Sequence, residues 1–177
     1  AEFVVRQSMA QLPESDRPRV LDPAAGAGVF LTTAFRQLVA REWAATGHRP
    51  GRKAIRRILK SQITGFDIDA RALRLAELGL YLTALELDPD PRPLAELKFD
   101  ALQGKVLYSM PLSSQGSLGP MEERFRGRFD VVLGNPPWSA VTDNRSSKRS
   151  WVDDSREIVS ERLGAERAAS FDLPDAN

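Results

Sequence analysis

Short apolar runs alternate with longer stretches of helical periodicity along most of the chain. Four runs have the length and the apolar content of buried strands, and they lie near residues 19–22, 62–67, 97–100 and 129–134. Apolar residues at helical spacing predict helices over about residues 29–45, 52–60 and 70–87. Strands that alternate with helices in this way predict an α/β fold.

The first predicted strand runs into a loop of small residues, Asp22-Pro23-Ala24-Ala25-Gly26-Ala27-Gly28. Gly26 and Gly28 tolerate positive φ and carry no Cβ, so the backbone can approach a ligand closely. The next helix offers the positive end of its dipole to that ligand. A dinucleotide fingerprint would need glycine where Leu31 stands, which weakens a nicotinamide interpretation. A plain strand–helix connection is the alternative.

Acidic residues lie at or near the ends of the next two predicted strands. Asp67 is well placed for ribose hydroxyls, because ligands of doubly wound sheets bind at the carboxyl ends of strands. Asp69 is explained more simply as a helix N-cap. Asp100 is a candidate acceptor for the amino group of a nucleoside base, and a solvated turn carboxylate is its alternative.

The fourth predicted strand runs into Asn135-Pro136-Pro137-Trp138. Proline fixes φ and has no N–H, so the neighbouring carbonyls are free to accept other hydrogen bonds. The Asn135 side-chain oxygen and the Pro136 carbonyl can together receive both hydrogens of a planar NH2 group, while the Trp138 ring covers its flat face. The tetrapeptide predicts a pocket for an exocyclic amine on a planar base; an ordinary Pro-Pro turn is the alternative.

Taken in order, these segments resemble the S-adenosylmethionine-dependent amino-methyltransferases, in particular the DNA adenine-N6 methyltransferases of restriction-modification and phage-defence systems. The loop 22–28 is similar to their D-P-A-C-G-S-G motif, with Ala25 and Ala27 in place of Cys and Ser. Residues 135–138 match their N-P-P-[YFW] motif in its Trp form. The resemblance, over about residues 2–138, implies a Rossmann-like class I methyltransferase sheet that is incomplete in this chain.

The resemblance also implies S-adenosylmethionine as cofactor and a role for each candidate residue. Asp67 would hold the ribose hydroxyls, Asp100 the adenine, and Ile68 would pack on the adenine ring. The other predicted cofactor-binding residues are Asp22, Pro23, Ala24, Gly26, Gly28, Phe30, Ala101 and Asn135. The predicted catalytic residues are Asn135, Pro136, Pro137 and Trp138, acting on an adenine flipped out of double-stranded DNA.

Residues 1–177 are expected to be the N-terminal part of a methyltransferase catalytic domain within a larger protein. Only about thirty residues separate Asp100 from Phe129, whereas a domain usually needs ~100. A target-recognition domain is therefore expected after the catalytic part, outside this chain, as in single-chain type I-like and type IIG enzymes. A nuclease is a further candidate partner in the same larger chain.

Composition narrows the functional classes. The chain has 42% hydrophobic residues, which suits one domain, and it has no apolar run near the ~18 residues needed to span a bilayer. It has no cysteine and a single histidine, which excludes disulfides and clusters of thiolate or imidazole metal ligands. With no signal peptide in view, these features favour a bacterial cytoplasmic protein.

The net charge of +1 does not identify a nucleic-acid-binding protein, so the local basic clusters matter more. The helix over residues 52–60 would turn Ile55, Ile58 and Leu59 inward. Its basic residues favour a solvated face, with a DNA surface as the alternative. A second cluster at 145–149 follows the catalytic motif directly and is a candidate contact for DNA phosphates, with a plain surface loop as the alternative.

Three other functions remain open at this point. A protein-glutamine methyltransferase also presents a planar NH2 to an Asn-Pro-Pro corner, although such proteins tend to carry an Asp-Leu-Gly-Thr-Gly type of loop instead of the one at residues 22–28. An RNA base methyltransferase shares the corner. A non-catalytic binding module that has kept the fold is the third alternative.

Overall fold

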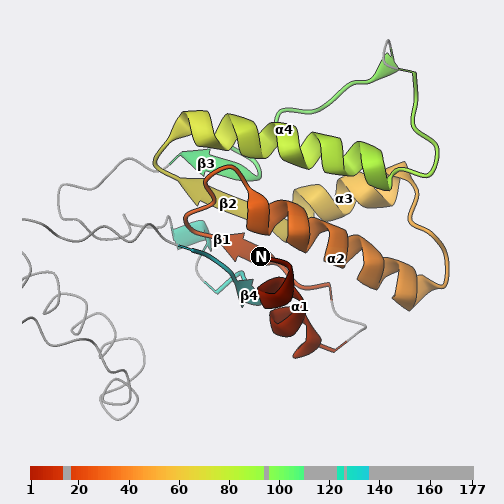
Figure 1. The fold of residues 1–177 in the computed structure, drawn as a ribbon, viewed down its shortest axis with the longest axis horizontal. Coiled ribbons are helices and arrows are strands. Elements are labelled where there is room, and N and C mark those ends of the chain that lie inside the picture. The colour runs from red at the N-terminus through yellow and green to blue at the C-terminus, as the bar shows by residue number, and fades with distance from the viewer. Residues whose placement is uncertain (14–16, 94–95, 110–122, 126, 136–177) are drawn as a thin grey trace, which may run out of the picture. The chain divides into compact units, whose positions relative to one another are not determined.

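A parallel four-stranded sheet organises the chain (Figure 1). The computed structural model describes residues 1–13, 17–93, 96–109, 123–125 and 127–135. The strands are β1 (Val20–Asp22), β2 (Ile63–Asp67), β3 (Leu107–Ser109) and β4 (Val131–Val132), in the order β3-β2-β1-β4. The order reverses between β1 and β4, so the crevice at their carboxyl ends is the topological switch point, where ligands of such sheets bind. This is the arrangement expected of part of a Rossmann-like methyltransferase sheet.

Four helices accompany the sheet: α1 (Glu2–Ala10), α2 (Val29–Thr46), α3 (Arg52–Gln62) and α4 (Ala70–Leu87). The predicted bounds of α2 and α4 are confirmed to within one residue, whereas α3 extends two residues beyond its predicted end at residue 60. Gly47 closes α2 in the left-handed conformation with φ 70°, as is common at helix C-termini. Asp69 caps α4 by accepting a hydrogen bond from the Arg71 amide at 2.8 Å, which satisfies one of the free amides of the first turn.

The two faces of the sheet are covered differently. On one face, α2 and α4 lie side by side (Figure 1) and bury Leu31, Phe35 and Leu80 in the main core. The predicted inward residues of α3, Ile55, Ile58 and Leu59, belong to the same core.

Phe66 lies on the opposite face of the sheet, because the side chains of neighbouring strand residues alternate between the two faces. There its ring lies 5.3 Å from that of Tyr108 and 5.1 Å from that of Phe125. Phe125 belongs to a short 3-10 helix, η2 (Glu123–Phe125).

The third strand is not where the sequence pattern predicted it. Residues 97–100 form no strand; β3 lies at Leu107–Ser109 and pairs with β2. Side chains of α4 satisfy the backbone of the predicted segment instead. The Tyr81 hydroxyl donates to the Asp100 carbonyl at 2.9 Å, and Glu77 accepts from the Leu102 amide at 2.7 Å. Backbone groups with such partners do not need a neighbouring strand.

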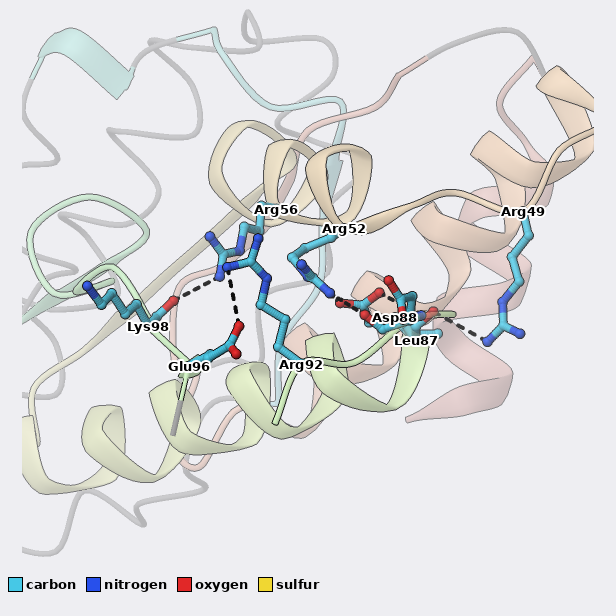
Figure 2. A network of polar contacts seen from close by, with 9 residues as sticks. Arg49, Arg52, Arg56, Leu87, Asp88, Arg92, Glu96 and Lys98 are labelled. Carbon is cyan, nitrogen blue, oxygen red and sulfur yellow. Dashed lines mark hydrogen bonds and ion pairs between the residues drawn. The ribbon is translucent and has the colours of Figure 1, made fainter. Parts of the chain in front are cut away.

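Three of the five basic residues of α3 contact the segment that follows α4, and Figure 2 shows two of these contacts. Arg52 donates to Asp88 at 2.7 Å, and the Arg56 guanidinium donates to the Lys98 carbonyl at 2.8 Å. Lys60, one further turn along, pairs with Asp100 at 2.5 Å. A spacing of four puts these three cations on one face of the helix. They fasten residues 88–93 and 96–100 to α3, so these three cations serve the fold and do not stand free for DNA.

The close packing of α2 on α4 requires glycine at position 28. Gly28 has φ +83°, and a Cβ built there would stand 2.8 Å from the Ala76 Cβ and 3.0 Å from the Ala76 Cα. Gly28→Ala should destabilise the fold by about 2–4 kcal/mol, because left-handed strain adds to overpacking against backbone. Gly47→Ala is the matched control: its φ is +70°, but no described atom lies within 4 Å of the built Cβ. Urea unfolding measures both, and equal losses would contradict the packing argument.

Within the described residues, no helix is long and apolar enough to cross a membrane. The same residues contain no group of three or more His, Cys, Asp or Glu arranged to hold a metal ion.

Candidate functional site

The glycine loop after β1 is held in place by the acid at the end of β2. The Gly26 amide donates to Asp67 Oδ2 at 2.7 Å, and the Asp69 amide donates to Asp67 Oδ1 at 2.8 Å. The Ala25 amide donates to the Phe66 carbonyl at 2.8 Å, which extends the β1–β2 connection into the loop. Asp67 therefore lies against the loop, and both its carboxylate oxygens accept hydrogen bonds from backbone amides.

Asp22, at the end of β1, is a buried carboxylate that is only half satisfied. Its Oδ1 accepts from the Ala24 amide at 3.1 Å, whereas its Oδ2 has no hydrogen-bond partner among the described residues. Burial raises the pKa of Asp22 to about 6; the Ala24 hydrogen bond opposes this shift and the charge of Asp67 adds to it. A buried acceptor without a donor costs stability, so this site is suited to a ligand that supplies a donor.

The raised pKa makes a prediction about folding. Because folded Asp22 holds its proton more tightly than the unfolded chain does, its contribution to stability is present below about pH 4 and is lost as pH rises through about 6. Asp22→Asn should remove this loss of stability, which amounts to at most about 1.4 kcal/mol of unfolding free energy per pH unit between about pH 4 and pH 6. Urea unfolding at several pH values, with the exposed Asp90→Asn as control, measures the difference. Parallel pH profiles of wild type and Asp22→Asn would contradict the prediction.

The segment after β4 returns to the same edge of the sheet. The Leu133 amide donates to the Leu21 carbonyl at 2.8 Å, which continues the pairing of β4 with β1. A Cβ built on Gly134 would lie 3.4 Å from Pro23 Cδ and 3.5 Å from Asp22 Oδ1. Asn135 follows and is exposed. The residue before the predicted catalytic motif therefore lies against the first two residues of the loop 22–28.

Several of the remaining predicted residues also lie near this edge. Ile68 follows Asp67 and is 60% exposed. Phe30, in the first turn of α2, is partly buried against the core. Pro136, Pro137 and Trp138 lie outside the described residues, as does the basic cluster 145–149.

Asp100 and Ala101 are not brought to this edge. Asp100 pairs with Lys60 at 2.5 Å, and that contact holds the pKa of the carboxyl below its usual range. Lys60 stands three residues before β2 begins, at the end of that strand opposite to Asp67. The geometry therefore does not support an adenine contact from either residue.

Ser109 occupies the position that the sequence pattern assigned to Asp100. It ends β3 and is in register with Asp67 across the β2–β3 pair. The sequence interpretation missed it because the strand was placed too early. The signal that would have found it is the short apolar run Val106-Leu107-Tyr108 after the positive-φ turn at Gly104.

Residues 6–168 match the family model described as MmeI, DNA-methyltransferase domain. No curated protein and no solved structure matches the chain. The matched residues include the loop after β1 and Asp67 at the end of β2, which meet at the switch point. They also include the Asn-Pro-Pro-Trp segment, of which only Asn135 lies among the described residues. The chain therefore belongs to the MmeI DNA-methyltransferase domain family, and is a DNA-methyltransferase domain of the restriction-modification type.

Proposed function

We propose that this domain transfers a methyl group from S-adenosylmethionine to the exocyclic N6 amino group of adenine in DNA. One observation carries the proposal. The loop after β1, Asp67 after β2 and the Gly134-Asn135 segment after β4 converge on one edge of the sheet, with Gly134 against Asp22 and Pro23. A methyl donor and an amine acceptor must lie within a few ångströms of each other for the transfer. Segments that converge on one edge of the sheet can bind both of them there.

The residues at the edge fit an adenosyl amino acid. Asp22 Oδ2 is buried and lacks a donor among the described residues, which suits an ammonium or hydroxyl group. No described atom lies within 4 Å of a Cβ built on Gly26, so ligand atoms can approach its backbone. Asp67 would hold the ribose hydroxyls, and the exposed Ile68 would pack on the adenine ring. Ser109, in register with Asp67, is the better candidate for the adenine edge than Asp100.

When bound, S-adenosylmethionine supplies an electrophilic methyl group on a sulfonium. The amino group of adenine is a weak nucleophile, because its lone pair is delocalised into the ring. The Asn135 side-chain oxygen and the Pro136 carbonyl would accept both amino hydrogens and direct the lone pair at the methyl carbon. Positioning of this kind can supply most of the rate. The proton that leaves the nitrogen can pass to solvent, so the reaction needs no strong base.

Base flipping supplies access to the amino group. Extruding adenine from the duplex costs a few kcal/mol. Stacking on Trp138 would return roughly 1–3 kcal/mol, and the pair of hydrogen bonds to the Asn135 oxygen and the Pro136 carbonyl would contribute about the same. The sum is comparable with the cost, so both residues should matter for DNA as substrate.

The test uses the full-length protein, unmethylated duplex DNA and isotopically labelled S-adenosylmethionine. The DNA is digested to nucleosides and analysed by mass spectrometry. Label on N6-methyldeoxyadenosine is the expected result. Label on another base position would refute the adenine assignment, and label that appears only on RNA or protein offered in parallel would favour one of the other methyltransferase classes.

A further inference from the structure

The outer face of α4 carries a row of exposed leucines. Leu75 is 60% exposed, Leu78 53% and Leu82 57%, while Leu73, Ala76 and Leu80 of the same helix are fully buried. At about 100° per residue the three exposed leucines lie within an arc of about 60°. Single exposed leucines are ordinary, but a continuous apolar row indicates an interaction surface. The helix lies at the margin of the helical layer, beside α2 (Figure 1).

The charges at the two ends of the row are opposite. Arg71 lies four residues before Leu75, and Glu86 lies four residues after Leu82. Their side chains are 87% and 60% exposed. Arg71 is paired within its own turn with Asp69, and Glu86 Oε2 accepts from Arg36 at 2.6 Å, yet both retain exposed polar atoms for a second partner.

Read backwards, the two charged residues and the outer two leucines have the same spacing of four, seven and four residues with the charges exchanged, and Leu78 lies half a residue from the centre of the row. A second α4 laid antiparallel on the first would set Leu75 against Leu82, Leu78 near its own counterpart, and Arg71 against Glu86. Isologous two-fold interfaces require this kind of self-complementarity. Arg71 and Glu86 are about 22 Å apart along the helix axis. Two helices that cross at about 20° can stay in contact over that length.

We propose that this face of α4 binds the same face of a second copy of the chain, forming an antiparallel two-fold dimer. The surface is independent of the proposed methyl transfer, since neither Asp67 nor Asn135 belongs to it. The leucine row covers much less than the roughly 800 Å² per partner of a standard interface. The dimer is therefore weak, with a dissociation constant on the order of 10 µM or more.

Sedimentation velocity of the full-length protein over a wide concentration range tests the proposal. Wild type should shift from monomer to dimer, and Leu78→Glu should weaken that association by about tenfold or more, because it buries a charge at the centre of the contact. Phe3→Glu, which changes an equally apolar and 75% exposed side chain on α1, is the control and should leave association unchanged. Far-UV circular dichroism and thermal unfolding establish that each variant is folded.

Charge reversal distinguishes self-pairing from any other use of the face. Arg71→Glu and Glu86→Arg should each weaken the dimer, and the double variant should restore it, because the opposite charges again face each other across the two-fold axis. Arg36→Ala shows separately the effect of losing the Glu86 pair within one copy. A wild type that stays monomeric, an unchanged dimer in Leu78→Glu, or a double variant no better than the single ones would overturn the proposal.

Discussion

Asn135→Ala is expected to reduce methyl transfer to DNA by well over about tenfold while leaving S-adenosylmethionine affinity nearly unchanged. The side chain is exposed at the end of β4, and in the proposed reaction its oxygen orients the target amine. Its loss would remove an interaction made with the substrate base, whereas most of the proposed contacts to the cofactor come from the loop after β1, from Asp67 and Ile68, and from Ser109. A small misplacement of the reacting groups can lower the rate by about a hundredfold.

Single-turnover methylation and calorimetric binding of S-adenosylmethionine, measured on the same protein preparation, separate the two effects. Asn135→Asp is the matched variant, because it keeps a side-chain oxygen that can accept from the amine. It should retain more activity than Asn135→Ala. An alanine variant that keeps more than about a tenth of the wild-type rate would remove Asn135 from the reaction.

Asp67→Ala should act in the opposite way to Asn135→Ala, because it should weaken the binding of S-adenosylmethionine first. In the proposed complex Asp67 holds the ribose hydroxyls, and hydrogen bonds to a charged group contribute about 1.5–3 kcal/mol each. The substitution also removes the acceptor of the Gly26 amide at 2.7 Å, so the glycine loop loses its anchor. We expect the dissociation constant to rise by at least about tenfold.

Asp69→Ala is the control for this variant, since it removes a second carboxylate only two residues away. Asp69 caps α4, and its loss should cost about 1 kcal/mol of folding stability without a matching loss of affinity. S-adenosylhomocysteine shares the ribose, so Asp67→Ala should weaken it as much as S-adenosylmethionine. Unchanged affinity for both ligands would show that Asp67 serves only the loop.

Much of the local structure was predictable from the sequence. The ends of α2 and α4 follow from Gly47 and Asp69, whose effects act within one helical turn. The first, second and fourth strands were found because each segment carries apolar residues that the sheet buries, such as Val20, Ile63 and Val131. The third was misplaced because the run at 97–102 is as apolar as a strand, yet Tyr81 and Glu77, distant in sequence, bond to its backbone.

The sequence by itself determined the α/β class, the bounds of α2 and α4 to within one residue, and the motifs that predict methyl transfer, because these depend on neighbours along the chain. Only the tertiary structure decided which segment pairs with β2, how Gly28 meets Ala76, and that Asp22 is buried with one oxygen unpartnered among the described residues. It also decided that Arg52, Arg56 and Lys60 of α3 bind Asp88, Lys98 and Asp100. Each of these depends on groups that come together only when the helices close over the sheet.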